Sequence, residues 1–304
     1  MARFGVYLPN VAWDGLAAPA AIAEYARTAE ALGFDSLWVE DRFLHRQTAV
    51  LEPLTTLTYV AAHTQRIRLG TSILLVNLRN PLVLAKMLGT LDYLSAGRVI
   101  LGVSLGGSAE EYAAAGVNMK TRVTRLTETL ATMKALWGTA TVKREGSQFP
   151  LSGVPLEPRP HTPISIWMGG RVDAALQRAG TIADGWLASS GTTAGDFAAG
   201  WAKVQEAARR AGRDPNALEP AKFAYIHCDK NTDEAFGVLA RALPRYYSAG
   251  YDVARNCIYG PVERCVEQSR HLLNSSVNTL IFSPVTADLK QLEVLGASVM
   301  QKLR

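Results

Sequence analysis

Short apolar runs alternate along this chain with segments whose apolar residues recur at helical spacing. The run RFGVYL is followed by residues 19–32, where Ile22, Ala26, Ala29 and Leu32 fall on one helical face. The runs DSLWVE, RIRLGTSILLV and RVILGVSL each begin a further unit of the same kind. The predicted strands recur about every thirty residues, the size of a strand-helix-strand unit with its crossover helix.

The alternation is interrupted between residues 138 and 163 by an excursion, GSQFPLSGVPLEPRPHTP, that is dense in glycine, proline and serine. It resumes with ISIWMGG, GWLASS, KFAYIHC and TLIFSP, and each of these runs precedes a helical segment. The eight predicted strands end near Leu8, Glu40, Val76, Val103, Met168, Ala188, His227 and Phe282.

The strands VILGV and SILLV are almost entirely apolar, which is typical of a parallel sheet buried on both faces. Eight such units favour closure into a (β/α)8 TIM barrel, with the excursion between strands four and five. An open doubly wound sheet would carry G-x-G-x-x-G after its first strand, where this chain reads YLPNVAWDG. We therefore expect one (β/α)8 barrel domain over residues 1–304.

Composition narrows the functional classes. Hydrophobic residues make up 48% of the chain and charged residues 19%, which suits a large core and disfavours disorder. No apolar run approaches the roughly 18 residues of a membrane helix, so we expect a cytoplasmic protein without a membrane partner. The net charge of +5 comes from scattered side chains, which disfavours nucleic acid as a partner. The three cysteines lack C-x-x-C spacing, so we expect free thiols and no structural metal.

Candidate functional residues stand where predicted strands end, because barrel enzymes place their chemistry at that rim. The set contains neither an H-x-H pattern nor a lysine at a strand end, which disfavours a metallohydrolase and a Schiff-base enzyme. The hard chemistry is then expected to belong to a cofactor. The candidates are Asn10, Glu40, Asp41, Arg42, residues 72–77, residues 104–108, Gly169, Gly170, Arg171, residues 189–191, His227, Asp229 and Ser283.

Two of these clusters allow two interpretations each. Gly169, Gly170 and Arg171 stand between a strand and an alanine-rich helix, so they form either a phosphate cradle or only a tight turn. Asp41 and Arg42 either orient a ring system or make a plain ion pair at the rim.

The segment GVSLGGSAEE after strand four carries a weaker signal. Its glycines are typical of close strand-helix packing. Glu110 and Glu111 are predicted to cap the first turn of the next helix rather than to act as acids.

Three blocks of this sequence resemble the luciferase-like monooxygenase superfamily. They are GFDSLWVEDRF, RIRLGTSILLVNLRNPLVLAKMLGTLDYLSAGRVILGVSLG, and PISIWMGGR with IADGW. The resemblance spans nearly the whole chain. The middle block is specific, because strand three, N-P, the L-A-K helix and L-D-x-L-S-x-G-R occur together in order.

The resemblance implies a (β/α)8 barrel that holds a reduced deazaflavin (coenzyme F420) or FMN at its rim, commonly within a homodimer. In the deazaflavin branch a non-prolyl cis peptide in strand three forms a bulge behind the cofactor ring, which corresponds to Ser72 and Ile73 here. In relatives the two glycines after strand five bind the cofactor phosphate, which corresponds to Gly169 and Gly170. The cofactor-binding residues expected on this basis are Ser72, Ile73, Ser104, Gly106, Gly107, Gly169, Gly170 and Arg171, and the expected catalytic residues are Asp41 and Arg42.

The chain departs from this family pattern at two positions. Relatives show Asp-His after strand two, where this chain has Asp41-Arg42, and a guanidinium cannot exchange protons at neutral pH. The sugar-phosphate dehydrogenase branch carries an acidic residue where Gly107 stands, which argues against that substrate class.

The leading hypothesis is an oxidoreductase acting on a small organic substrate, either by hydride transfer or by oxygen activation with FMN. A cofactor-binding protein that has lost catalysis remains the alternative, and a barrel hydrolase is disfavoured.

Overall fold

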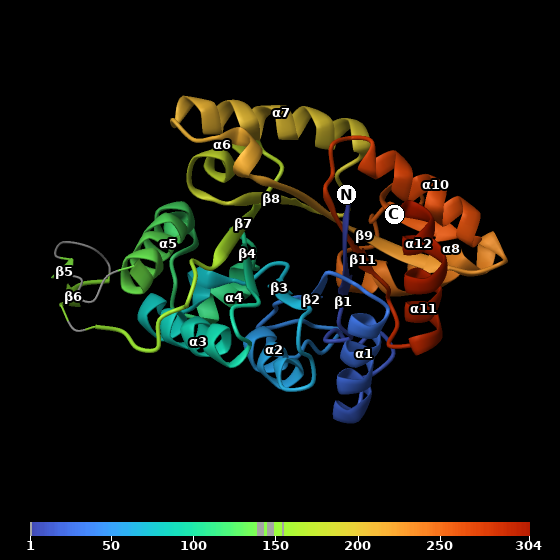
Figure 1. Ribbon diagram of the computed structural model, residues 1–304, viewed down its shortest axis with the longest axis horizontal. Coiled ribbons are helices and arrows are strands. Elements are labelled where there is room, and N and C mark those ends of the chain that lie inside the picture. Colours follow the sequence, from blue (N-terminus) through green and yellow to red (C-terminus); the bar gives the residue numbers. More distant parts are fainter. Residues whose placement is uncertain (1, 139–142, 145–148, 154) are drawn as a thin grey trace.

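Eight parallel strands close into a barrel in the computed structural model, which describes residues 2–138, 143–144, 149–153 and 155–304 (Figure 1). Each barrel strand pairs in parallel with the next, and β9 pairs with both β8 and β11, which closes the barrel. The predicted (β/α)8 TIM barrel is therefore confirmed. The barrel strands are β1 (Arg3–Tyr7), β2 (Ser36–Val39), β3 (Arg68–Thr71), β4 (Val99–Val103), β7 (Ser165–Gly169), β8 (Gly185–Ala188), β9 (Glu219–Cys228) and β11 (Thr279–Ser283).

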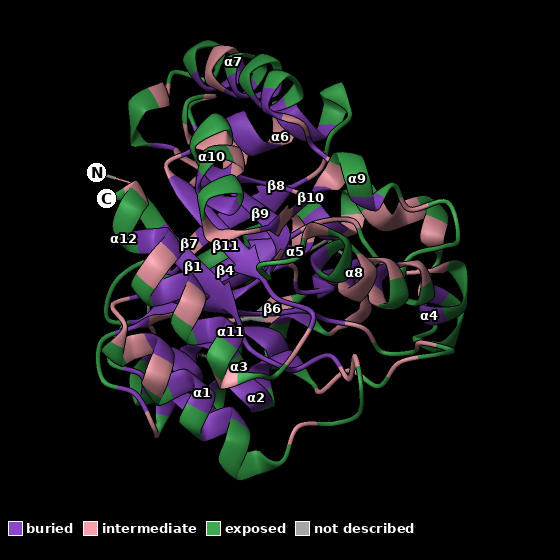
Figure 2. Ribbon diagram, turned by 90° about the vertical axis from the view of Figure 1, so that its right-hand side faces the viewer, coloured by how far each residue is buried: buried purple, intermediate pink, exposed green. Residues whose placement is uncertain are grey.

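Helices surround the strands and turn their exposed faces outward (Figures 1 and 2). Proline fixes the first turn of α1 (Pro19–Ala31), α2 (Pro53–Ala61) and α3 (Pro81–Leu94), where its missing N–H costs no helical hydrogen bond. The other α-helices are α4 (Ala109–Ala114), α5 (Arg122–Gly138), α6 (Asp173–Ile182), α7 (Ala194–Arg210), α8 (Thr232–Tyr246), α9 (Val253–Asn256), α10 (Val262–Leu273), α11 (Leu289–Val294) and α12 (Gln301–Leu303). Among the described residues, every helix is too short or too polar to span a membrane.

The interior of the barrel is filled by aromatic side chains. The rings of Trp38 and Trp167 pack with centroids 5.3 Å apart, and both side chains are buried. A Cβ at Gly70 would lie 2.5 Å from the Trp38 ring, so only glycine leaves room for the indole at that level of the barrel. These buried indoles occupy the barrel interior below the rim.

Strand three is shorter than predicted. It ends at Thr71 rather than near Val76, and the Ser72–Ile73 peptide bond that follows is cis, as the resemblance implied. Leu74 forms an isolated bridge with Val103, and a 3₁₀ turn (Val76–Leu78) comes next. Leu74 and Val76 are fully buried although they lie beyond the strand. The apolar run in the sequence therefore reflects burial of the loop and not an extension of the strand pairing.

Two further short pairings lie outside the eight strands. β10 (Cys257–Gly260) pairs in parallel with the last residues of β9 and was not predicted from the sequence. In the excursion, β5 (Lys143–Arg144) pairs antiparallel with β6 (Leu151–Ser152). The prediction for residues 139–142, 145–148 and 154 of the excursion lies outside the described residues.

Candidate active site

A cavity of about 280 Å³ opens at the carboxyl ends of the barrel strands. It is lined by all ten residues expected at the site from the sequence: Asp41, Arg42, Ser72, Ile73, Ser104, Gly106, Gly107, Gly169, Gly170 and Arg171. The barrel thus brings together residues that are distant in the sequence. Seven further residues complete the lining, namely Glu40, Leu75, Leu187, Ser189, Phe223, Tyr246 and Tyr247. We call this cavity the rim pocket.

Glycine backbone forms one wall of the rim pocket. Gly107 and Gly170 have φ angles of 78° and 135°, in the region that favours glycine. A Cβ at Gly170 would lie 2.5 Å from Ala175 Cβ, and one at Gly106 would lie 2.5 Å from Leu75 Cδ2. The wall therefore has no room for side chains at these positions, and its exposed backbone suits close approach of a flat ring system.

The cis peptide bond lies at the end of β3 beside this glycine wall. The Tyr7 hydroxyl, which comes from β1, donates to the Ser72 carbonyl at 3.1 Å. Ile73 packs near the backbone of Gly106 and Gly169. The ends of β1, β3, β4 and β7 thus meet behind the pocket.

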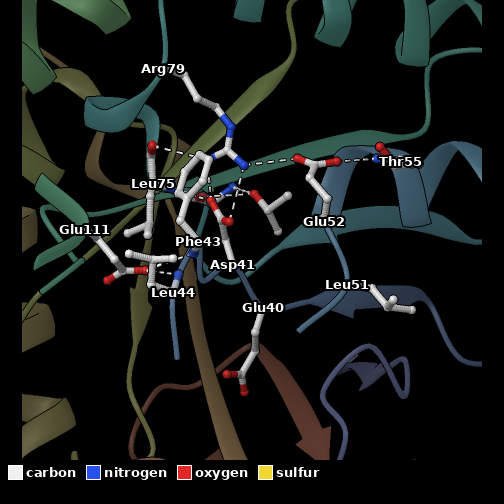
Figure 3. A network of polar contacts seen from close by, with 12 residues as sticks. Glu40, Asp41, Phe43, Leu44, Leu51, Glu52, Thr55, Leu75, Arg79 and Glu111 are labelled. Atoms are coloured by element: carbon white, nitrogen blue, oxygen red, sulfur yellow. Dashed lines mark hydrogen bonds and ion pairs between the residues drawn. The ribbon is translucent and has the colours of Figure 1, made fainter. Parts of the chain in front are cut away.

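Asp41 and Arg42 do not pair with each other, so the interpretation of these two residues as a plain ion pair at the rim is wrong. The Asp41 carboxylate accepts the Leu75 backbone N–H at 2.8 Å and holds Arg79 through both oxygens, at 2.5 and 3.2 Å (Figure 3). Burial raises the pKa of Asp41, while the Arg79 guanidinium acts in the opposite direction. Asp41 is therefore committed to structure and has little freedom to exchange protons.

Arg79 is the centre of a wider network that sequence reasoning missed. Its guanidinium also pairs with Glu52 at 3.0 Å and lies 4.4 Å from the centroid of the Phe43 ring (Figure 3). Its side chain is only 12% exposed. The arginine ties the loops after β2 and β3 to the start of α2, and nothing in the sequence pattern around it signals those partners.

Arg42 instead pairs with Glu111, at 3.1 Å between Nη1 and Oε2. Glu111 caps α4 as predicted, through a capping box with Ser108. It also accepts the backbone N–H groups of Phe43 and Leu44, at 2.9 and 3.3 Å (Figure 3). Burial raises the pKa of Glu111, but these N–H donors and the charge of Arg42 outweigh burial and hold it below its usual range.

Glu40 points away from this network (Figure 3). Its residue is 6% exposed, and it accepts the Tyr225 hydroxyl at 3.1 Å. The Tyr225 and Tyr247 hydroxyls are 2.8 Å apart. Burial raises the pKa of Glu40, and hydrogen bonds from Tyr246 and Tyr225 partly offset the rise. The sequence placed Glu40 at the rim without a role and missed the tyrosines, because they come from β9 and the end of α8, about 185 positions or more away in the chain.

A second cavity of about 830 Å³ adjoins the rim pocket and shares Arg171, Ser189 and Tyr247 with it. We call it the outer groove. The carbonyl of Gly170 accepts the Trp186 Nε1–H at 2.9 Å, which fixes the turn before α6. The N-cap residue of α6 is Val172, which lines the outer groove and whose side chain cannot accept a hydrogen bond from the first backbone N–H groups of the helix. The positive end of the helix dipole therefore lies at the groove.

Lys222 stabilises the wall between the two cavities from behind. It is almost fully buried on β9, and its Nζ donates to the carbonyls of Ser189, Ser190 and Phe223 at 2.8, 3.2 and 3.3 Å. Burial lowers its pKa to about 7. Lys222 does not line the rim pocket, so it positions the Ser189 segment and does not reach a ligand there.

The closed parallel barrel thus gathers glycine backbone, two arginines and a buried carboxyl group at the rim where barrel enzymes place their active sites. The chain belongs to the luciferase-like monooxygenase family, whose model matches residues 1–261. The resemblance seen in the sequence is thereby confirmed. Within the described residues, no group of three or more His, Cys, Asp and Glu side chains is placed to hold a metal ion.

Individual relatives extend this result. A 5,10-methylenetetrahydromethanopterin reductase from Methanolobus tindarius is 30% identical over 214 residues, which cover 70% of this chain and 63% of the relative. An F420-dependent glucose-6-phosphate dehydrogenase from Kineococcus radiotolerans is 36% identical over 181 residues, which cover 57% of this chain and 53% of the relative. The chain thus spans between 53% and 63% of the length of these curated relatives.

The fold is shared with a solved structure. An F420-dependent secondary alcohol dehydrogenase in complex with an F420-acetone adduct superposes with a TM-score of 0.87. The superposition covers 100% of this chain and 98% of that one, at 19% identity.

Replacing Arg79 by methionine should lower the free energy of unfolding by about 3 to 5 kcal/mol, because it leaves the Asp41 carboxylate buried without its partner. Adding Asp41→Asn should recover part of this loss. The measurement is urea unfolding. The control is Arg46→Met, which removes an exposed pair with Glu110 and should change little. Equal losses in Arg79→Met and Arg46→Met would show that the buried pair carries no special weight.

Proposed function

We propose that this chain is an oxidoreductase that binds reduced coenzyme F420 in the rim pocket and passes hydride between it and a small organic substrate. The observation that carries the proposal is the gathering of the glycine wall, Ser72 and Ile73, and the rim arginines around one cavity. Glycine allows the close backbone approach that a planar cofactor needs. Two relatives named as a reductase and an F420-dependent dehydrogenase favour hydride transfer over oxygen activation.

The cofactor phosphate is proposed to lie against Gly169 and Gly170, beside Arg171. Gly169 and Gly170 expose backbone at the end of β7, and α6 begins three residues after Gly170. Together a helix N-terminus and a guanidinium favour an anion. Arg171 lies on the boundary between the rim pocket and the outer groove, so the cofactor would extend from one cavity into the other.

Arg42 is proposed to stand at the edge of the ring. Its side chain is 28% exposed and lines the rim pocket, so its charge acts in a partly dry environment. A permanent cation there favours the anionic reduced ring over the neutral oxidised one. Glu111 neutralises part of this charge, which limits the size of the effect.

Two alternatives keep the same fold and pocket. Reduced FMN could occupy the site and activate oxygen, or the chain could bind a cofactor without turnover. The second alternative rests on Arg42, which stands where relatives carry histidine. A sugar phosphate is not the proposed substrate. Gly107 has a φ of 78° and supplies no carboxylate, and Glu111, the nearest acid on α4, is engaged by Arg42 and three backbone N–H groups.

We further propose that the protein works as a homodimer through the outer face of α2 and α3. Five large apolar side chains on α3 are between 39% and 58% exposed, and Tyr59 of α2 adds to them. Exposed apolar side chains concentrated in this way are typical of an interaction surface. The α3 residues are Leu82, Val83, Met87, Tyr93 and Leu94.

The cofactor proposal is tested by titrating the unliganded protein with F420 and with FMN while following cofactor fluorescence. F420 should bind, and Arg171→Ala should weaken its binding at least tenfold, since a hydrogen bond to a charged group contributes about 1.5 to 3 kcal/mol. The control is Arg66→Ala, an exposed arginine that precedes β3 at the opposite end of the barrel. Binding of FMN alone would favour the oxygen-activating alternative. Binding of neither cofactor would contradict the proposal.

Arg42→Ala should lower the reduction potential of the bound cofactor. The substitution removes a positive charge and leaves the Glu111 carboxylate without its partner, and both changes disfavour an anionic reduced ring. Arg42→His should give a potential that varies with pH, because imidazole titrates near neutrality. Redox titration of both variants beside Arg46→Ala provides the comparison. Potentials that match the unmodified protein in every variant would place Arg42 away from the ring.

Val83→Glu should convert the dimer to a monomer, because it puts a charge at the centre of the apolar face of α3. Sedimentation velocity measures the mass directly. Val123→Glu on α5, where the valine is 41% exposed, is the matched control and should leave the mass unchanged. A monomeric unmodified protein would rule out this dimer.

A further inference from the structure

Hydride transfer to a carbonyl group needs a proton as well, and few residues of the rim pocket can supply it. Asp41 is held by Arg79 and the Leu75 N–H. Guanidinium groups are not deprotonated in proteins, which removes the two arginines of the lining from the candidates. The remaining titratable groups in the pocket lining are Glu40, Tyr246 and Tyr247.

Glu40 has a continuous hydrogen-bonded connection to the outer groove. The Tyr225 hydroxyl lies 3.1 Å from Glu40 Oε1 and 2.8 Å from the Tyr247 hydroxyl. Tyr225 is fully buried, whereas Tyr247 is 42% exposed and lines both cavities. Two hydrogen bonds therefore join the buried carboxyl group to a tyrosine that borders both cavities.

The surroundings of Glu40 favour its neutral, proton-carrying form. Burial raises the pKa of Glu40. Of the groups that lower this pKa, Tyr246 and Tyr225 act through hydrogen bonds, and Arg42 is the one that carries a charge. Its backbone is fixed by the Asn10 side chain, which accepts the Glu40 N–H at 3.1 Å and donates to the Glu40 carbonyl at 2.8 Å. The ionisable groups that face the carboxyl are Tyr7, Arg42, Tyr225, Tyr246, Tyr247 and Tyr251.

We infer, on the basis of the function proposed above, that Glu40 is the catalytic residue that exchanges the proton of the substrate, and that Tyr225 and Tyr247 relay this proton to the outer groove. In the reducing direction, bound reduced F420 would supply the hydride that forms the C–H bond at the carbonyl carbon. The carbonyl π bond breaks, and its oxygen takes the proton of the Glu40 carboxyl group. The substrate is reduced to an alcohol and the cofactor is oxidised. The Glu40 carboxylate then regains a proton from Tyr225, which is supplied by Tyr247 and finally by water, and alcohol oxidation runs the same steps in reverse.

The first experiment uses the unliganded protein and needs no substrate. A carboxyl group with a raised pKa contributes stability that is present below its unfolded pKa and is lost as the pH rises through its folded pKa. The difference in thermal midpoint between the unmodified protein and Glu40→Gln should therefore fall as the pH rises from the unfolded to the folded pKa of Glu40. Above the folded pKa the difference should stay constant. Glu52→Gln is the control. Burial raises the pKa of Glu52, but the Thr55 N–H and Arg79 lower it below its usual value. The contribution of Glu52 to stability is therefore lost as the pH falls, which is the opposite trend.

The second experiment follows oxidation of reduced F420 by the probe ketones acetone and cyclohexanone. Glu40→Gln should lower kcat by about 100-fold or more while F420 affinity stays unchanged, which is the usual effect of removing a general acid. Tyr225→Phe should lower kcat less and should shift the pH profile upward, because Tyr225 lowers the pKa of Glu40 through its hydrogen bond.

The outcomes separate this inference from the proposed function. Failure of F420 to bind the unmodified protein overturns both. Normal F420 binding with an unchanged kcat in Glu40→Gln overturns only the role of Glu40. A stability difference between the unmodified protein and Glu40→Gln that does not vary with pH overturns it as well, whether or not either ketone is reduced.

Discussion

The buried ion pair between Asp41 and Arg79 is the contact on which the rest of the rim depends. Through it the loop after β2 is joined to the loop after β3, and Glu52 adds the start of α2. A buried pair of this kind adds less to stability than its short distances suggest, because desolvation offsets the attraction. Its value lies in specifying one arrangement, since separating the charges would leave either of them unsatisfied in a dry environment.

Glu111 performs the same task on the other side of the β2 loop. It binds Arg42 and two backbone N–H groups of that loop while also capping α4. With both sides fixed, the consecutive residues Glu40, Asp41 and Arg42 point in different directions and reach different partners. One short segment after a single strand thus provides a buried acid, a structural anchor and a fixed cation.

The sequence was sufficient to predict the barrel, because apolar strands are local features. Together with the family resemblance it also named ten residues that line the rim pocket, whereas the candidates Asn10, His227, Asp229 and Ser283 do not line it. It was insufficient wherever function depends on pairing across the barrel. The hydrogen bond from Tyr225 to Glu40 joins β9 to β2, and no spacing rule connects residues so far apart. The end of β3 was misplaced for a related reason, since buried loop residues such as Leu74 carry the same apolar signal as a strand.

The position of Tyr247 has a consequence for timing. This residue borders both cavities and is the outer end of the proton path proposed from Glu40. A ligand long enough to occupy the rim pocket and the outer groove together would cover Tyr247 and cut the path off from bulk water. The buried acid would then hold a single proton for as long as the ligand stays, and it would be recharged only after the groove empties. Release of the ligand and reloading of the acid would thus become a single event in each turnover cycle.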